Sequence, residues 1–139
     1  MKAKQALIEE LSEDMAQQMG LVLVAVEVLP GLIRVFADAD GGITLGECEK
    51  LSRAIGRALD EHDISDEPYV LEVSSPGLER VLKTQRELQW ATGKRVKLLL
   101  RDGKTLFGTL ESADESSVSV DGQAFATEQI ARISLSEVA

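Results

Sequence analysis

The sequence predicts an α+β protein in two parts: an N-terminal α-β-β-α-β domain, with a three-stranded sheet and two helices, and a small all-β barrel of the SH3-like or Sm-like kind. In the first part, two long segments repeat apolar residues at helical spacing, and shorter segments alternate apolar and polar residues as strands do. The last part, residues 94–139, contains five short apolar runs and two Asp-Gly turns. With 139 residues and 44% hydrophobic content, the chain has enough apolar material for two small cores.

The first predicted elements are a helix and a hairpin. Residues 3–19 are predicted to be helical because apolar side chains recur along one face and Gly20 follows as a stop signal. These side chains are Leu7, Ile8, Leu11, Met15 and Met19. A strand over residues 21–28, a Pro30-Gly31 turn and a strand over residues 32–37 are expected to form the hairpin.

A second helix is predicted to run from Leu45 to about His62. Thr44, with Glu47 three residues later, is a capping-box pattern that opens a helix. Its buried face is expected to contain Leu45, Cys48, Leu51, Ser52, Ile55 and Leu59. An acidic loop then ends at Pro68, and the next strand begins at Tyr69. Because the strands alternate, both helices should cover mostly one face of the sheet.

The third strand of the first domain leads into a tight turn. Along residues 69–74, apolar side chains point one way (Tyr69, Leu71, Val73), whereas Glu72 and Ser74 share the other face with Val70. The turn is predicted to be defined by Ser74, Ser75, Pro76 and Gly77. Proline fixes its own φ and glycine permits a positive φ, so this sequence favours a sharp, stiff reversal.

The remaining elements divide the chain into three regions. Residues 1–83 are expected to form the first domain and residues 94–139 the barrel. Between them, a short helix over residues 84–93 is interpreted as a linker, with Thr84 and Glu87 as a second capping box. The barrel strands are predicted at residues 95–100, 105–110, 118–120, 124–127 and 130–135, with a single helical turn at residues 128–130.

The charge of the chain is unevenly distributed. The formal net charge is −9, yet residues 75–104 contain eight cations and three anions, so this stretch is +5 and the remainder is −14. Six cations are candidates for contact with the phosphates of RNA: Arg80, Lys83, Arg86, Lys94, Arg95 and Lys97. The alternative is an ordinary solvated surface of mixed charge.

Aromatic residues make up only 4% of the chain, which argues against extensive reading of RNA bases by stacking. Phe107 and Phe125 lie in predicted barrel strands. Core packing is the expected role of both side chains, and base stacking is the alternative.

No catalytic, cofactor or metal site is predicted. A calcium loop would have Asp38, Asp40 and Glu49 at its first, third and last positions. However, its fifth position is Gly42, which has no side-chain oxygen, and its sixth position, which requires glycine, is Ile43. His62 with Ser74 and Ser75 lacks the local sequence of a hydrolase nucleophile. One cysteine and one histidine are too few for a zinc site within one chain.

The chain contains no apolar run long enough for a membrane helix and no recognisable targeting segment. We therefore expect a cytoplasmic protein without a membrane partner.

The segment Ser74-Ser75-Pro76-Gly77-Leu78, followed by an acidic residue and Arg80, resembles the signature of the ribosome maturation factor RimP family. Two upstream segments, residues 41–45 and 48–53, have the order and spacing of that family. The chain departs from the signature at Glu79, where Asp is common, and at Val81, where a proline usually stiffens the exit from the turn. We therefore expect the path after Arg80 to be less constrained in this chain.

The resemblance implies a KH-like RimP N-terminal domain and a noncatalytic factor for assembly of the 30S (small) ribosomal subunit. Such a factor would bind an immature particle through rRNA and through a basic small-subunit ribosomal protein, which in this family is associated with the barrel domain. A monomer without cofactors is expected. The alternative is a stand-alone Sm-like or KH-like RNA-binding regulator.

Overall fold

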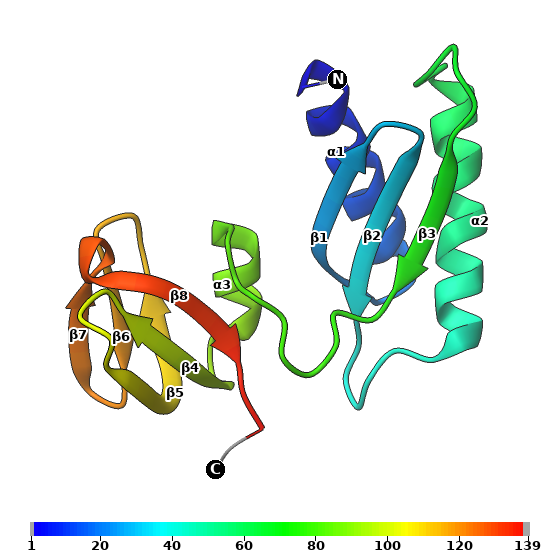
Figure 1. The fold of residues 1–139 in the computed structure, drawn as a ribbon. Helices are drawn as coiled ribbons and strands as arrows, with labels where there is room; N and C mark the ends of the chain where they lie inside the picture. Colours follow the sequence, from blue (N-terminus) through cyan, green and yellow to red (C-terminus); the bar gives the residue numbers. More distant parts are fainter. Residues whose placement is uncertain (1, 138–139) are drawn as a thin grey trace. The chain divides into compact units, whose positions relative to one another are not determined.

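The structure is a computed structural model that describes residues 2–137. The chain forms two compact units, residues 1–76 and 77–139. The first has the order α1 (Lys2–Gln18), β1 (Val22–Leu29), β2 (Leu32–Asp38), α2 (Leu45–Glu61) and β3 (Val70–Ser74) (Figure 1). The second contains α3 (Gln85–Ala91), β4 (Arg95–Leu100), β5 (Thr105–Ala113), β6 (Ser117–Val120), β7 (Gln123–Ala126), the 3-10 turn η1 (Thr127–Gln129) and β8 (Ile130–Leu135). The predicted α+β fold class is confirmed.

The sheet of the first unit has the order β1-β2-β3. β1 and β2 form the predicted antiparallel hairpin, and β3 is parallel to β2. A parallel neighbour requires a crossover connection, which α2 supplies. Both helices lie on the same side of the sheet (Figure 1), and the core between them includes Ile8, Val35, Leu51 and Ile55, all fully buried.

The capping box of α2 forms as predicted. The Glu47 N–H donates to Thr44 Oγ1 (3.1 Å), and the Thr44 N–H donates to Glu47 Oε1 (3.0 Å). The predicted burial of Leu45 is wrong, because this side chain is 77% exposed. Leu45 begins the helix, and the first buried side chain, Cys48, comes almost one turn later. Burial raises the pKa of the Cys48 thiol, and the neighbouring carboxylates of Glu47 and Glu49 raise it further.

The second unit is built on a five-stranded antiparallel sheet in the order β7-β6-β5-β4-β8. Asp121 and Gly122 form the predicted tight turn between β6 and β7, each with a positive φ (50° and 79°). The core is formed mainly by Val96, Leu98 and Leu110, which are fully buried. β5 continues to Ala113, three residues beyond its predicted end.

The segment predicted as a linker helix, residues 84–93, lies within the second unit. The two units divide between Pro76 and Gly77 rather than at residue 83. Ala91 is fully buried in the second core, and Leu88 and Trp90 pack beside it. A helix of only seven residues is unstable alone, so this apolar contact is needed to hold α3.

Across residues 2–137, every helix is too short or too polar to cross a membrane.

Two glycines with opposite environments provide a test of this packing. A Cβ atom on Gly108 in β5 would lie 2.6 Å from Asp121 Oδ2 and 2.6 Å from Val120 Cγ1, whereas a Cβ on Gly56 in α2 would lie 3.9 Å from its nearest neighbour, Leu71 Cδ2. We expect Gly108→Ala to lower the free energy of unfolding by about 1–3 kcal/mol through overpacking. Gly56→Ala should raise it by about 0.5–1 kcal/mol, because alanine favours a helix.

Urea unfolding followed by far-UV circular dichroism would measure both changes. Equal stability of the Gly108→Ala variant and the wild type would contradict the close approach of Asp121 to β5.

Candidate functional site

The turn that carries the sequence signature begins at the end of β3. The strand alternates as predicted: Val70, Glu72 and Ser74 are exposed, and the intervening side chains are half-buried. Ser74 and Ser75 expose their side chains, and Gly77 has a φ of +80°. Glycine is therefore favoured at position 77, because most residues with a Cβ are strained at this φ.

Beyond the turn, residues 80–82 lie along the outer edge of β8. The Leu82 N–H donates to Ile133 O (2.8 Å), and the Leu135 N–H donates to Arg80 O (2.9 Å). Val81 pairs with Ser134 between these two bonds. The path after Arg80 is therefore fixed by β8, which corrects the expectation that Val81 leaves it less constrained. These two bonds use the backbone of residues 80 and 82, so the proline that is common in the family at position 81 is also compatible with the pairing.

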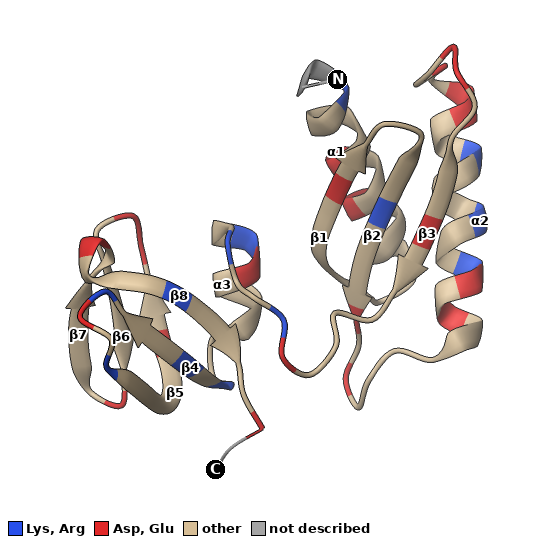
Figure 2. Ribbon diagram, viewed as in Figure 1, with Lys and Arg blue, Asp and Glu red and all other residues tan. Residues whose placement is uncertain are grey.

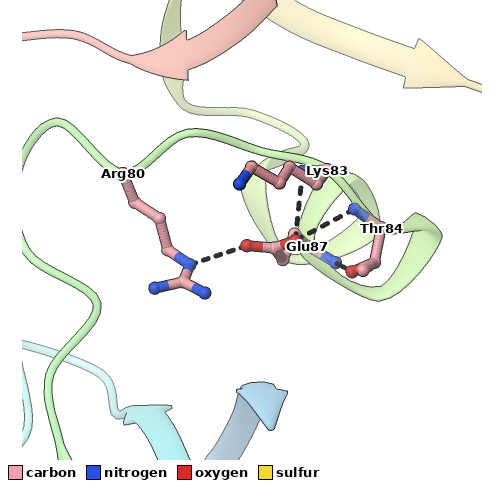
Figure 3. A network of polar contacts seen from close by, with 4 residues as sticks. All are labelled: Arg80, Lys83, Thr84 and Glu87. Atoms are coloured by element: carbon pink, nitrogen blue, oxygen red, sulfur yellow. Dashed lines mark hydrogen bonds and ion pairs between the residues drawn. The ribbon is translucent and has the colours of Figure 1, made fainter. Parts of the chain in front are cut away.

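The carboxylate of Glu87 connects this segment to α3 (Figure 3). Its Oε2 accepts a 2.6 Å hydrogen bond from Arg80 Nε, and Oε1 accepts from the N–H groups of Lys83 (3.0 Å) and Thr84 (2.9 Å). The Glu87 N–H in turn donates to Thr84 Oγ1 (3.1 Å), which completes the predicted capping box. The side chains of Arg80 and Glu87 are only 12% and 3% exposed. One buried carboxylate thus binds three residues that precede α3.

The Arg80 ion pair changes the interpretation of this candidate cation. The sequence-based hypothesis treated Arg80 as a cation available to phosphates, but its guanidinium is largely buried against Glu87. Burial by itself would raise the pKa of the Glu87 carboxyl. The hydrogen bonds from Arg80, Lys83 and Thr84 outweigh burial and hold that pKa below its ordinary value. Removing Arg80 would leave the buried carboxylate of Glu87 without the positive charge of this ion pair.

Two of the other candidates, Lys83 and Lys94, have exposed side chains. Lys83 contacts Glu87 through its backbone N–H (Figure 3), so its ammonium group is not used in that hydrogen bond. The Nζ atom of Lys94 lies 5.0 Å from the ring centroid of Trp90, which orients the lysine over the aromatic face. Both cations are placed where a phosphate could reach them.

Arg86, Arg95 and Lys97 are half-buried. In β4, Arg95 and Lys97 alternate with the core residues Val96 and Leu98, so they lie on the outer face of the sheet. The Nε atom of Arg95 is buried and has no hydrogen-bond partner in the described part of the chain.

Two neighbouring grooves share Val81 and Arg132. One, of about 410 Å³, is largely apolar and includes Lys83, Leu88 and Ile133 in its lining. The other, of about 590 Å³, includes Lys97 and Phe107. Sequence reasoning did not select Arg132, because it lies far beyond the cationic stretch. Only the pairing of β8 with β4 places it close to Lys97.

The charges of the second unit are unevenly distributed along the chain. Residues 77–104 contain eight cations and three anions, whereas residues 105–139 contain one cation and six anions. The cations lie on α3, β4, β8, the β4–β5 turn and the residues that precede α3, and a group of anions lies around the ends of β5, β6 and β7 (Figure 2). We call Glu111, Asp114, Glu115 and Asp121 the acidic flank. Hydrogen bonds from the backbone N–H groups of Ser117 and Ser116 hold the pKa of Asp114 below its ordinary value.

The two barrel phenylalanines have different environments. Phe125 is 7% exposed and belongs to the core, as predicted. The predicted burial of Phe107 is wrong, because this side chain is 41% exposed on the outer face of β5. The error arises because inward and outward positions on β5 both carry apolar residues, so only the strand pairing assigns the faces.

The residues that could suggest catalysis or metal binding are dispersed. His62 caps the C-terminus of α2, and its Nδ1 lies 2.9 Å from Ala58 O. Ser74 ends β3, roughly 13 Å along the strand from Val70, the end that the His62 loop joins. A base must lie within hydrogen-bond reach of its nucleophile. Within residues 2–137, no group of three or more His, Cys, Asp or Glu side chains could hold a metal ion.

Comparison with known families assigns the first unit. The family model described as the RimP N-terminal domain matches residues 11–79, about half of the chain. The chain belongs to the RimP family. The matched residues extend from α1 to Glu79 in the signature segment, so they include all three strands of the first sheet and the turn after β3. Membership supports a role as a ribosome maturation factor in general.

The Glu87 contacts can be tested by Glu87→Gln, with Glu79→Gln as a control at an exposed acid in the same segment. We expect Glu87→Gln to lower the free energy of unfolding of the second unit by about 1.5–3 kcal/mol at pH 7, because a charged hydrogen-bond partner is lost. Trp90, the single tryptophan, packs on the second core, so its fluorescence during urea unfolding reports on this unit.

The pH dependence has a defined sign. The pKa of Glu87 is lowered on folding from its ordinary value of 4.5, so its stabilising contribution is complete above about pH 5. It is lost as the pH falls through the folded-state pKa. The stability gap between wild type and Glu87→Gln should therefore be constant from pH 7 to 5 and narrow below pH 4.5. A gap that widens in acid would contradict this assignment.

The turn at Gly77 can be tested with two substitutions that differ in how well the new residue tolerates a positive φ. Gly77→Val should lower the unfolding free energy by about 1 kcal/mol more than Gly77→Asn, because asparagine tolerates a positive φ and a β-branched residue does not. Thermal unfolding by circular dichroism would compare them, and equal midpoints would show that the positive φ is not required.

Proposed function

We propose that the protein is a noncatalytic maturation factor of the small ribosomal subunit, which binds an immature 30S particle. The observation that carries this proposal is the match to the RimP N-terminal domain over residues 11–79. The two folded units and the presence of both a cationic stretch and an acidic stretch in the second unit support it, because an assembly factor must contact both RNA and protein on one particle.

Contact with rRNA is assigned to cations of the second unit. Lys83 and Lys94 are exposed, and Lys97 borders a groove, so these three side chains can approach phosphate oxygens. Arg80 contributes indirectly by fixing the segment that carries Lys83. The first unit has fifteen acidic and six basic side chains, a net charge of −9, which opposes indiscriminate binding to polyanions.

Contact with a basic ribosomal protein is assigned to the acidic flank. Ribosomal proteins that reach into rRNA are rich in Lys and Arg, and opposite charge both accelerates encounter and selects the orientation. Because the acidic flank lies on β5 and on the turns at the two ends of β6, whereas most cations lie on other elements, the second unit could bind a basic protein and rRNA at the same time (Figure 2).

A factor of this kind acts by differential affinity. It must bind the immature particle more tightly than the finished subunit, since a ligand with equal affinity for two states shifts neither. Release on maturation then follows without a chemical step.

Sedimentation of a cell extract through a sucrose gradient tests the proposal. We expect the protein to migrate with free 30S particles and to be absent from 70S ribosomes and polysomes. Migration with messenger RNA outside ribosomal particles would reject the proposal in favour of a stand-alone RNA-binding regulator.

The contribution of Lys83 can be tested by charge reversal, with Lys50→Glu on the exposed surface of α2 as a matched control. Lys83→Glu should weaken binding to purified immature 30S particles several-fold and make the affinity less dependent on salt, because fewer counterions are released. The midpoint of thermal unfolding should change by less than about 2 °C, since an exposed charge contributes little to stability. If Lys83→Glu bound these particles as tightly as Lys50→Glu and the wild type in filter-binding assays, Lys83 would not contribute to the interface.

A further inference from the structure

An exposed aromatic ring lies among cations on the outer face of the second sheet. Phe107 of β5 is directly opposite Lys97 of β4, and Lys97 is directly opposite Ser134 of β8. Val96 and Leu98, the neighbours of Lys97 in β4, are fully buried, so Lys97 and its cross-strand partners belong to the outward face. Directly opposite residues in antiparallel strands have Cβ atoms about 4.5–5.5 Å apart.

Arg132 is on the same face, one outward position from Ser134 along β8. It is paired with Leu99 of β4, and its side chain is exposed. Phe107, Lys97 and Arg132 line a single groove of about 590 Å³, together with Glu79 and Glu137 among other residues. Cationic positions of the adjacent strands β4 and β8 are coloured in Figure 2. This volume is in the usual range for a site that binds a small ligand or one residue of a polymer.

We propose that this groove binds an unstacked base of single-stranded RNA, with the base on the ring of Phe107 and the adjoining phosphates at Lys97 and Arg132. An aromatic ring on a sheet surface with flanking cations is the combination that single-stranded nucleic acids require, because each nucleotide presents a flat π-face and a negative phosphate. The inference rests on the proposed function, which places the protein on an RNA-rich particle, and it identifies a contact that charge alone did not select.

The two carboxylates in the groove favour particular bases. Carboxylate oxygens accept hydrogen bonds from the amino groups of cytosine, adenine and guanine, whereas uracil has no amino group. A basic peptide is disfavoured by Lys97 and Arg132, since both cations line the same groove as the ring. Oligocytidine is therefore the probe, because it combines an amino group with a small base that unstacks easily.

The test measures binding of the full chain to a short oligocytidine by NMR titration. Phe107→Leu, which keeps an apolar side chain but removes the ring face, should weaken binding about tenfold. Phe107→Tyr should bind as the wild type does, because the ring is kept. Arg132→Gln should weaken binding and reduce the slope of log affinity against log salt by about 0.7, the value for one phosphate contact on a single strand.

Two controls separate this site from general effects. Val70→Ala truncates an apolar side chain of the first unit that is more exposed than Phe107, and Lys50→Gln removes an exposed cation of the first unit. Both variants should bind oligocytidine as the wild type does. Thermal unfolding checks that Phe107→Leu remains folded. If it does not, Arg132→Gln and Phe107→Tyr still decide the outcome through the salt slope and the retained affinity.

Equal affinity of Phe107→Leu and the wild type would overturn the inference. So would perturbation of the Phe107 resonances by a lysine-rich peptide and not by oligocytidine. Sedimentation of the same variants keeps this result separate from the proposed function. Wild-type migration with 30S particles, together with unchanged oligocytidine binding by Phe107→Leu, rejects the base site alone. Failure of the wild type to migrate with 30S particles rejects the proposed function alone, because the titration does not use the ribosome.

Discussion

The buried carboxylate of Glu87 is the contact on which the candidate surface depends. Three residues that precede α3 donate hydrogen bonds to it, and one of them, Arg80, also brings a compensating positive charge. The free energy of a hydrogen bond to a charged group is about 1.5–3 kcal/mol, a large fraction of the stability of a small unit. Without this contact, the segment between the turn and α3 would lose the link to α3 and keep its two backbone bonds to β8 and the burial of Leu82 in the second core.

Cations that are close together in the sequence have different structural roles in this arrangement. Arg80 is used inside the second unit, and Lys83, three residues later, leaves its ammonium group exposed. Arginine suits the buried position because its guanidinium holds several donors in a fixed plane and stays charged. Lysine suits the exposed position, since a flexible ammonium group can follow a phosphate backbone without a fixed geometry.

The second unit has no net charge, but its cations and anions are unevenly distributed along the chain. It contains nine basic and nine acidic side chains, so its net charge of zero gives no indication of either a cationic or an acidic surface. The family match ends at Glu79, and the cations and the acidic flank lie almost entirely beyond it. The family assignment therefore rests on the first unit, whereas the surfaces proposed for RNA and protein belong to the second.

The sequence by itself determined the fold class, the order of the elements and both capping boxes, because hydrophobic periodicity, Thr-x-x-Glu patterns, glycine turns and Asp-Gly turns are local signals. It also determined the signature turn, in which Gly77 has the positive φ that its position required. The place of α3 in the second core, the ion pair of Arg80 with Glu87 and the exposure of Phe107 were decided by tertiary structure. Each depends on which strand or helix lies beside the residue. Strand pairing likewise brings Arg132 next to Lys97, across 35 residues of chain, and no spacing rule connects two positions that meet only after the sheet has formed.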